Sequence, residues 1–359
     1  MNIMVSDVAA ENGGMLSILN DFYDFIKAKK DMSIRWTFIL GLPKLQETES
    51  ITVINFPWAK ISWLHRLFFD VFVTPLLVKK HHIDAILSLQ NVCVPFVRVL
   101  QTVYVDKALP FTEHKLTFSD TKYLWAQQKI IGAYTIRSIK KASHVIVQTK
   151  WMKEICVKKA SLDPHAVMII SPTVKIPDDF KFIDNPSHRK TFFYPASPMI
   201  YKNHSLVLKS CEILKQRGIN DYNVIFTLNG SENPHIKKLF QETALKGLNI
   251  KWYGPLPRQQ CFELYSQSVL LFPSYIETVG LPMLEAKLVG SFVIASDCSF
   301  SHEILDDYKN ANFFDYKNAN QLADLMESVL TEKFKYTKIE KMQFKSTDSQ
   351  KRLYDFITK

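Results

Sequence analysis

Residues 272–286 read FPSYIETVGLPMLEA. An apolar strand ends, a loop carries Glu277, and Gly280 with Pro282 opens a helix that contains Glu285. The start of a helix offers backbone N–H groups and a positive dipole end, which together suit a diphosphate. The two carboxylates can then accept hydroxyl groups from a sugar and from a ribose. The alternative is that both glutamates lie on a solvated helix face, and the glycine and proline between them argue against it.

Strand-like and helix-like runs alternate on both sides of this stretch, which is the pattern of parallel sheets covered by helices. Strands are predicted near residues 3–6, 34–40, 51–55, 85–89, 102–106, 144–148 and 167–171, and again near 191–194, 223–228, 250–253, 269–272 and 292–295. The clearest helices are predicted over 15–30, 63–80, 122–142 and 150–159. The sequence therefore predicts an α/β protein with doubly wound sheets.

The alternation lapses between residues 173 and 190 into Pro, Asp, Asn and Ser, which favour turns. We therefore predict one domain over residues 1–175, a second over 190–345, and a helix within 346–359 that returns to the first domain. A length of 359 residues agrees with two domains of about 170 residues each. Such domains bind ligands in the crevice at the carboxyl ends of their strands.

The composition argues against several classes of protein. Hydrophobic residues make up 47% of the chain and no fixed repeat is present, so a folded globular protein is expected. The first residues lack the basic start and long apolar segment of a secretory signal, and the apolar patch at 67–78 is interrupted by Asp70. We therefore expect no transmembrane helix and a cytoplasmic protein. The five cysteines have no paired spacing, which indicates neither a zinc site nor a disulfide framework.

Positive charge is concentrated in the first half of the chain. Residues 1–175 hold 22 Lys and Arg against 14 Asp and Glu, within a net charge of +10 for the whole chain. No zinc finger or RNA-binding signature accompanies this charge, so nucleic acid is not an expected partner. Residues 63–69 and 130–141 mix bulky apolar and basic side chains at helical spacing, which favours contact with an anionic membrane. The alternative is two amphipathic helices that face the core, and both interpretations can hold together.

The opening stretch resembles the signature of a known family. The pattern P-S-x-x-E-x-x-G-L-P-x-L-E-A, with seven residues between Glu277 and Glu285, is similar to that of family 4 GT-B glycosyltransferases, also described as glycosyl transferases group 1. The flanking runs 252–256 and 290–296 resemble the strands and turns of that family, and residues 143–149 resemble its strand before the linker. The resemblance is strong over residues 190–305 and loose before them.

The resemblance implies a GT-B fold, with two Rossmann-like doubly wound domains facing a central cleft, and a retaining reaction. It places Glu285 on the donor ribose and Glu277 beside the sugar ring and the departing phosphate. Lys202 matches the family lysine that neutralises the leaving diphosphate. The other donor-binding residues offer backbone groups or border the base and phosphates: Gly13, Gly14, Tyr253, Gly254, Leu256, Thr278, Val279, Gly280 and Leu281. No metal and no other cofactor is implied, because Lys202 and helix dipoles replace the divalent cation.

Two departures affect what the resemblance implies. The family pattern has an arginine several residues before the lysine, but residues 195–199 read PASPM. It also has a histidine where this chain has Asp106, at the end of a predicted strand. We assign Asp106 a catalytic role on the acceptor side as a hypothesis, and the alternative is an aspartate that caps the next element. By themselves, Lys202 could be a surface charge and the paired glycines at 13–14 a simple turn.

The leading hypothesis is a hexosyltransferase, which transfers a hexose-type sugar from a nucleoside diphosphate sugar to an acceptor hydroxyl. The basic first domain favours a lipid-linked oligosaccharide acceptor, as in the biosynthesis of O-antigen, capsule or exopolysaccharide, with the protein peripheral at the inner face of the cytoplasmic membrane. Two alternatives share the fold. One is a non-catalytic nucleotide-sugar-binding partner subunit, which the two departures motivate, and the other is a GT-B sugar epimerase.

Overall fold

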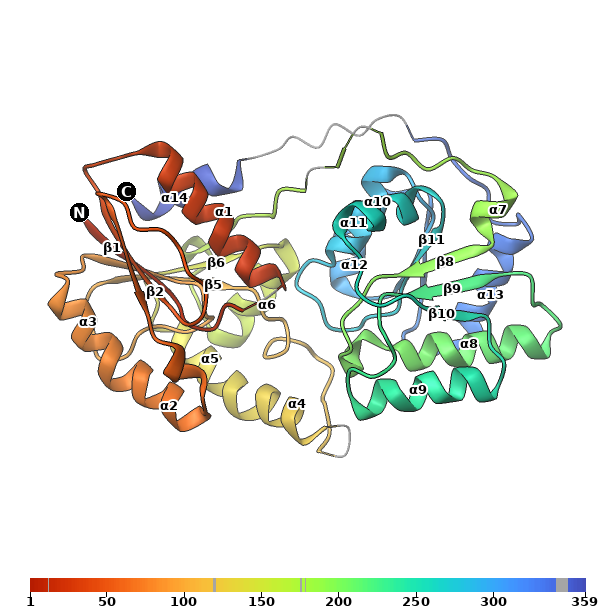
Figure 1. Ribbon diagram of the computed structural model, residues 1–359, viewed down its shortest axis with the longest axis horizontal. Helices are drawn as coiled ribbons and strands as arrows, with labels where there is room; N and C mark the ends of the chain where they lie inside the picture. Colours follow the sequence, from red (N-terminus) through yellow and green to blue (C-terminus); the bar gives the residue numbers. More distant parts are fainter. Residues whose placement is uncertain (12, 119–120, 175, 178, 340–347) are drawn as a thin grey trace. The chain divides into compact units, whose positions relative to one another are not determined.

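The computed structural model describes residues 1–11, 13–118, 121–174, 176–177, 179–339 and 348–359. The chain forms two compact units (Figure 1). The first unit comprises Met1–Thr173 together with Ser346–Lys359, and the second comprises Val174–Lys345. The predicted start of the last helix, Ser346, lies outside the described residues, and helix α14 covers Ser349–Ile357.

The first unit is built on a seven-stranded parallel sheet in the order β3-β2-β1-β4-β5-β6-β7. The strands are β1 Asn2–Asp7, β2 Arg35–Leu40, β3 Ile51–Asn55, β4 Ala85–Ser88, β5 Leu100–Val105, β6 His144–Val147 and β7 Val167–Ile169. The helices of this unit are α1 Gly13–Lys29, α2 Trp63–Phe68, α3 Thr74–Lys80, α4 Lys122–Ala126, α5 Gly132–Ile139, α6 Lys150–Ala160 and α14, with short 3₁₀ turns η1 Pro57–Lys60 and η4 Pro164–Ala166.

Both faces of this sheet are buried, and alternate residues of one strand enter different cores. Ile3 and Val5 of β1 pack in a cluster that includes residues of α1 and Leu353 of α14. Met4, between them, packs in a second cluster with Phe69 and other residues near α3. A strand buried on both faces reads as a continuous apolar run, which is why the strands of this unit could be predicted from sequence. Helix α14 thus supplies part of the first unit's core.

Two helices that the sequence predicts as continuous contain a π-helical turn. The turn η2, Phe69–Val73, joins α2 to α3, and η3, Gln127–Ile131, joins α4 to α5. In the first of them Thr74 Oγ1 donates to the carbonyl of Phe69 at 3.1 Å, while Thr74 and Phe69 are both buried. Neither helix, nor any other in the described part of the chain, is long and apolar enough to cross a membrane.

The second unit is built on a six-stranded parallel sheet in the order β10-β9-β8-β11-β12-β13. The strands are β8 Thr191–Tyr194, β9 Asn223–Phe226, β10 Ile250–Trp252, β11 Val269–Phe272, β12 Val293–Ser296 and β13 Ala311–Phe314. The helices are α7 Pro186–Arg189, α8 His204–Gln216, α9 Pro234–Leu245, α10 Arg258–Ser266, α11 Leu281–Val289, α12 Ser299–Leu305 and α13 Ala319–Leu330, with the 3₁₀ turn η5 Ile200–Lys202. Strand β13 was not among the predicted strands.

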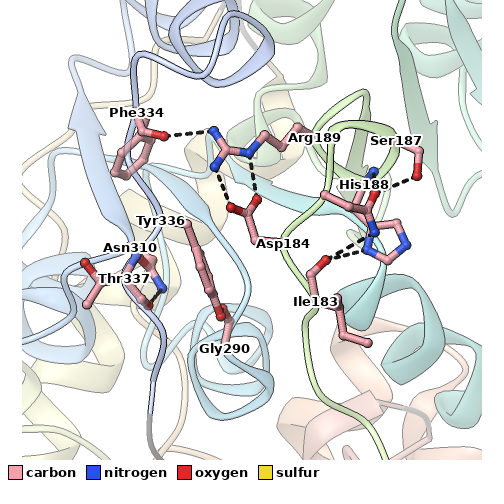
Figure 2. A network of polar contacts seen from close by, with 11 residues as sticks. Ile183, Asp184, Ser187, His188, Arg189, Gly290, Asn310, Phe334, Tyr336 and Thr337 are labelled. Carbon is pink, nitrogen blue, oxygen red and sulfur yellow. Dashed lines mark hydrogen bonds and ion pairs between the residues drawn. The ribbon is translucent and has the colours of Figure 1, made fainter.

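Residues before the predicted start of the second domain are part of the second unit, which begins at Val174 rather than at residue 190. Figure 2 shows why: both Nε and Nη2 of Arg189 donate to the carboxylate of Asp184 at 2.7 Å, and Nη1 donates to the carbonyl of Phe334 at 3.0 Å. The backbone N–H of Phe182 donates to the carbonyl of Val289 in α11. Turn-forming residues in this stretch therefore border a packed segment and not an open linker.

Candidate functional site

The second sheet reverses its winding between β8 and β11. From β8 towards one edge of the sheet the strands are β8, β9 and β10, and from β11 towards the other edge they are β11, β12 and β13. Open α/β sheets bind ligands at such a switch point, outside the carboxyl ends of the strands. Lys202 follows β8 and Glu277 follows β11, and Lys202 Nζ forms an ion pair with Glu277 Oε1. Two residues predicted from separate motifs therefore meet at the switch point.

The backbone of Lys202 is held from both sides. Tyr194 OH, at the end of β8, donates a hydrogen bond to the carbonyl of Lys202 at 2.7 Å. The next residue, Asn203, has a left-handed backbone with φ of 61°, and its side-chain amide donates to the carbonyls of Tyr316 at 2.8 Å and Pro273 at 3.3 Å. The ion pair therefore joins two loops whose backbones are already tied to each other. Only 16% of the Lys202 side chain is exposed, so its charge is partly shielded from water.

The start of α11 requires a glycine. Gly280, which precedes the first helical residue, has φ of 79°, and a Cβ there would lie 2.5 Å from Cε of Met283. Thr278, Val279 and Leu281 flank it, so all four predicted residues lie at the helix start. Val279 is 4% exposed, so its side chain is buried, and the group that it can offer a ligand is its backbone N–H. N–H groups in the first helical turn lack partners within the helix, so this end of α11 suits an anion.

Glu285 is oriented by two donors. Its Oε2 accepts a hydrogen bond from Tyr265 OH at 3.0 Å, and its Oε1 accepts one from Nη2 of Arg258 at 3.0 Å. Burial raises the pKa of Glu285, and the charge of Arg258 and the bond from Tyr265 act in the opposite direction. The sequence reasoning missed Arg258 and Tyr265 as partners of Glu285, because nothing in the spacing along α10 indicates which residue faces α11.

Residues 253–256, which follow β10, form a second edge of the candidate site. Gly254 has φ of 76°, and a Cβ there would lie 2.4 Å from Oδ1 of Asn229, so a glycine is needed next to the loop after β9. The backbone N–H of Tyr253 donates to the carbonyl of Phe226 at 3.0 Å, while its side chain is 51% exposed. Leu256 is partly exposed. An exposed aromatic ring and an apolar side chain on these loops suit contact with a flat ring.

A buried histidine lies directly after Lys202 and Asn203. His204, the first residue of α8, is 1% exposed, and its ring lies 4.9 Å from that of Tyr194 and 5.0 Å from that of Phe226. Neither ring nitrogen has a hydrogen-bond partner among the described residues. Burial, with the charge of Lys202, lowers the pKa of His204 to about 3, so the ring is neutral at physiological pH. His204 was not among the site residues predicted from the sequence.

Asp106 lies in the first unit, directly after β5. Its Oδ1 accepts a hydrogen bond from the side-chain amide of Asn91 at 2.7 Å, and Asn91 Oδ1 accepts the backbone N–H groups of Asp106 at 2.9 Å and of Lys107 at 3.1 Å. Burial raises the pKa of Asp106. The next helix, α4, is capped by Thr121, whose side chain accepts the backbone N–H of Leu124, so Asp106 does not cap it. The carboxyl group of Asp106 is held by Asn91 at the carboxyl edge of the first sheet.

The glycine pair at 13–14 does not form the predicted turn. Gly13 and Gly14 are the first two residues of α1, and a Cβ on Gly14 would meet nothing within 4 Å. A side chain at position 14 would therefore meet no steric obstacle. The structure describes each unit by itself, so the predicted central cleft, and the meeting of residues 13–14 and Asp106 with the second-unit site, stay predictions.

No group of three or more His, Cys, Asp or Glu side chains in the described ranges is arranged to hold a metal ion. The free cysteines Cys93, Cys156 and Cys211 are buried, and Cys261 and Cys298 are partly exposed.

Two parallel, doubly wound units are the architecture of GT-B glycosyltransferases, and solved structures confirm this fold class. WaaG, described as a glycosyltransferase involved in lipopolysaccharide biosynthesis, is similar with a TM-score of 0.69 and 13% identity, covering 100% of both chains. Anabaena HepE in complex with UDP and glucose has a TM-score of 0.68 and 14% identity, covering 100% of this chain and 99% of HepE. Identities this low establish the fold alone.

In sequence, residues 175–345, which lie in the second unit, match the family model described as Glycosyl transferases group 1. The O-antigen chain mannosyltransferase RfbU of Salmonella typhimurium is 23% identical over 181 residues, which are 50% of this chain and 49% of RfbU. An uncharacterised 41.2 kDa protein in the cps region of Klebsiella pneumoniae is 23% identical over 228 residues, 61% of this chain and 60% of that protein. The matches thus span about half to three fifths of these curated relatives.

Proposed function

We propose that this protein is a glycosyltransferase that moves a sugar from a nucleoside diphosphate sugar to a hydroxyl group of an acceptor. The observation that carries the proposal is the ion pair of Lys202 and Glu277 at the switch point of the second sheet, beside the start of α11. A cation, a carboxylate and a helix start in one place suit a ligand that carries both a diphosphate and sugar hydroxyls.

Glu285 and the loops beyond it are proposed to hold the nucleoside. Tyr265 and Arg258 each donate a hydrogen bond to one oxygen of the Glu285 carboxylate, which fixes the orientation of the group. Each oxygen keeps a further lone pair that can accept a ribose hydroxyl. Tyr253, Gly254 and Leu256 would border the base. The diphosphate would lie at the start of α11, where Thr278, Val279, Gly280 and Leu281 supply backbone N–H groups.

Lys202 is proposed to stabilise the leaving group. Negative charge grows on the diphosphate as its bond to the sugar breaks, and a partly buried ammonium group interacts strongly with such a charge. A bound diphosphate would compete with Glu277 for Lys202, which frees the Glu277 carboxylate to accept a sugar hydroxyl. In this arrangement Lys202 and the helix start take the role that a divalent cation has in other transferases, and no further cofactor is required.

Membership of family 4 and retention of the anomeric configuration are part of the proposal. They rest on the resemblance of the segment between Glu277 and Glu285 to the signature of that family. Retention is tested by NMR of the product, in which the coupling constant of the anomeric proton distinguishes the two configurations. A product with the configuration opposite to that of the donor would contradict it.

The acceptor is proposed to be a lipid-linked oligosaccharide in the biosynthesis of a surface polysaccharide. The support is the description of RfbU as an O-antigen chain mannosyltransferase and the position of the Klebsiella relative in a cps region. A lipid-linked acceptor places the reaction at a bilayer, and we propose that the protein works as a peripheral protein at the inner face of the cytoplasmic membrane.

A stripe of exposed apolar side chains supports the membrane contact. Along α2, η2 and α3 the exposed fractions are 62% for Trp63, 76% for Leu64, 57% for Leu67, 54% for Phe68, 58% for Phe72 and 67% for Leu76. The opposite side of the same helices is buried, through Phe69, Leu77 and Val78. The core-facing interpretation of this helix is therefore confirmed, and the membrane contact stays a proposal that the exposed side supports. Lys79 and Lys80 at its end add positive charge, which attracts anionic lipid headgroups.

The membrane contact is tested by co-sedimentation with vesicles of phosphatidylglycerol and phosphatidylethanolamine. The variant carrying Trp63→Ser, Leu64→Ser and Phe68→Ser should bind more weakly than the unmodified protein. The control is Leu245→Ser, which changes a side chain that is 86% exposed but lies on α9 of the second unit. Equal binding of all three proteins would contradict the membrane contact and leave the transferase proposal standing.

The transferase proposal is tested by incubating the protein with a panel of labelled nucleotide sugars and a membrane lipid extract, and following label in the lipid fraction. Labelled lipid with the unmodified protein and none with Glu277→Ala is the expected result. Donor binding without turnover in every combination, equal in Glu277→Ala, would favour a non-catalytic binding subunit. A modified sugar released without acceptor would favour an epimerase.

A further inference from the structure

The segment of residues 95–100 leads into β5 at the amino edge of the first sheet. The strands β4, β5 and β6 are adjacent in this sheet and parallel, so the residues before each of them lie at the same edge. The buried side chain of Gln101 holds the two ends of the segment together. Its Oε1 accepts the backbone N–H of Val94 at 2.8 Å, and its Nε2 donates to the carbonyl of Val94 at 3.0 Å. The chain between Val94 and Gln101 therefore forms a closed loop at this edge.

Side chains of the 95–100 segment alternate between the core and the solvent. Val97 and Val99 are partly buried and pack against the core cluster that α3 helps to form. Phe96, Arg98 and Leu100 are exposed, with exposed fractions of 84% for Phe96 and 62% for Leu100. The segment thus borders the same core as α3, whose outer side belongs to the exposed apolar stripe described above. Its outward apolar side chains add to that stripe.

Phe96 is unfavourable for the fold in two respects. Its backbone is left-handed, with φ of 60°, a conformation that a bulky side chain disfavours. Its ring is more exposed than those of Trp63, at 62%, and Phe72, at 58%, so it gains little from burial in the protein. Backbone strain of this kind persists where it serves a function, and here it presents an aromatic ring to the surroundings.

Basic side chains surround this ring. Exposed cations precede each of the three strands, namely Lys79 and Lys80 before β4, Arg98 before β5, and Lys140 and Lys141 before β6. Asp84 also lies at this edge, and its carboxylate accepts the backbone N–H of Asn2 at 2.7 Å. An apolar group among cations is complementary to an anionic bilayer, in which headgroups attract the cations and the interface accepts an aromatic ring.

We propose that the 95–100 segment is a second membrane anchor, in which Phe96 inserts into an anionic bilayer while Arg98 and the neighbouring lysines bind the lipid headgroups. A fluid bilayer accommodates a single exposed ring, whereas a protein partner needs a complementary surface of about 1,000 Å² in total. The inference rests on the proposed function and deepens it, because it adds a separate group of residues to the membrane contact proposed for α2, η2 and α3.

The anchor is tested by co-sedimentation of the full chain with vesicles of phosphatidylglycerol and phosphatidylethanolamine. Phe96→Asn should bind about 10-fold more weakly than the unmodified protein, because the ring no longer leaves water on binding. Its stability in urea should be equal or higher, since asparagine adopts a left-handed backbone more readily than phenylalanine. Leu245→Asn is the matched control, at a side chain that is 86% exposed on α9 of the second unit. Equal vesicle binding of Phe96→Asn and the unmodified protein would overturn the anchor.

Insertion is measured separately with Phe96→Trp, which keeps an aromatic ring at the site. Vesicles with brominated acyl chains quench a tryptophan that enters the bilayer, and the reference is the fluorescence of the unmodified protein, which has 6 tryptophans. The fluorescence added by Phe96→Trp should be quenched when the vesicles contain phosphatidylglycerol, and that added by Leu245→Trp should not. Equal quenching of the two variants, or none in Phe96→Trp, would refute insertion. Equal quenching by vesicles of phosphatidylcholine alone would refute the role of the cations.

The anchor and the proposed function can fail separately. If the variant of Trp63, Leu64 and Phe68 binds vesicles weakly and Phe96→Asn binds them fully, the anchor is refuted and the contact through α2 stands. If Phe96→Trp is quenched but the unmodified protein transfers no sugar from any donor, the transferase proposal is refuted and the anchor stands. An unmodified protein that binds no vesicles would refute both membrane contacts, and transfer of label to the lipid extract would still decide the transferase activity.

Discussion

Lys202 Nζ lies against Glu277 Oε1, so the ion pair joins the loops after β8 and β11, two strands that are adjacent in the sheet and 75 residues apart at these positions. Hydrogen bonds from Asn203 to the carbonyls of Pro273 and Tyr316 tie the same loops together. The charged groups are thereby held in place before a ligand arrives, which lowers the cost of ordering them on binding.

Removing the ammonium group of Lys202 should therefore have its main effect on kcat. We expect Lys202→Ala to lower kcat by about 100-fold or more, because preorganised charges at a departing group have effects of this size. The measurement is transfer from the preferred donor at saturating acceptor. Lys190→Ala is the control, since Lys190 pairs with Asp221 at an exposed site. A kcat of Lys202→Ala equal to that of the control would refute the leaving-group role.

Glu285 should control donor affinity rather than turnover. We expect Glu285→Gln to raise the KM for the donor by about 10-fold, which corresponds to about 1.4 kcal/mol of lost ribose contact. Because burial raises the pKa of Glu285, the carboxylate gains a proton at higher pH than an ordinary glutamate, and donor binding should weaken as the pH falls through that range. Calorimetric titration with UDP at decreasing pH, compared between the unmodified protein and Glu285→Gln, measures this. The same pH dependence in both proteins would argue against a contact with Glu285.

Activity should not depend on a divalent cation. The proposed function gives the role of a divalent cation to Lys202 and the start of α11. We expect the transfer rate with EDTA to equal the rate with added Mg²⁺. Loss of transfer in EDTA, restored by Mg²⁺, would contradict the proposal that Lys202 and the start of α11 stabilise the leaving diphosphate.

His204 should make the stability of the second unit depend on pH. Its pKa is lowered to about 3 in the folded protein, below the ordinary value of about 6.5, so the stability it contributes is fully present above pH 6.5 and is lost as the pH falls towards 3. At pH 5 the loss amounts to about 2 kcal/mol. His204→Phe should keep the packing and remove this loss, since neither ring nitrogen has a partner in the described residues.

The measurement for His204 is urea unfolding at pH 7 and pH 5, with the two proteins compared at each pH. The variant should gain stability relative to the unmodified protein as the pH is lowered. An equal pH dependence of the two proteins would show that His204 is protonated in the folded state, and the environment described for it would then be wrong.

Helix α14 should be required for the stability of the first unit. Leu353 is 2% exposed in the first core, and Leu353→Ala should cost about 2–4 kcal/mol. Tyr354 OH donates to Asp31 at 2.6 Å, so Tyr354→Phe should have a smaller effect. Lys351→Ala, on the exposed side of the same helix, is the control. Unfolding of the first unit at the same urea concentration in all three would contradict the role of α14.

The sequence predicted the parts of the molecule that local pattern determines. The strand, loop and helix over 269–289 could be predicted because Gly280 and the following proline mark a helix start in residue type alone. Strand β13 was missed because Ala311 and Asn312 interrupt its apolar character. The π turns at 69–73 and 127–131 were missed because the sequence there keeps an ordinary helical spacing.

Contacts between side chains of different helices and strands could not be predicted from the sequence. Arg258 and Tyr265 meet Glu285 only because α10 packs on α11, and no spacing in the chain indicates this. Asp7 follows a short apolar run and looks like an ordinary strand end. Within the described residues its Oδ2 has no hydrogen-bond partner, which depends on the order of strands in the sheet and on what covers them, and a single sequence does not determine either.

The return of α14 also has a consequence for how the protein folds. The first unit's core is made from residues at both ends of the described chain, with the whole second unit between them in sequence. During synthesis the ribosome therefore releases the second unit, which is continuous, before it releases the last helix of the first. The second unit can fold as soon as it emerges, whereas the first must wait with Trp36 and its neighbours incompletely covered. We therefore expect newly made chains to aggregate mainly through the unit that is translated first.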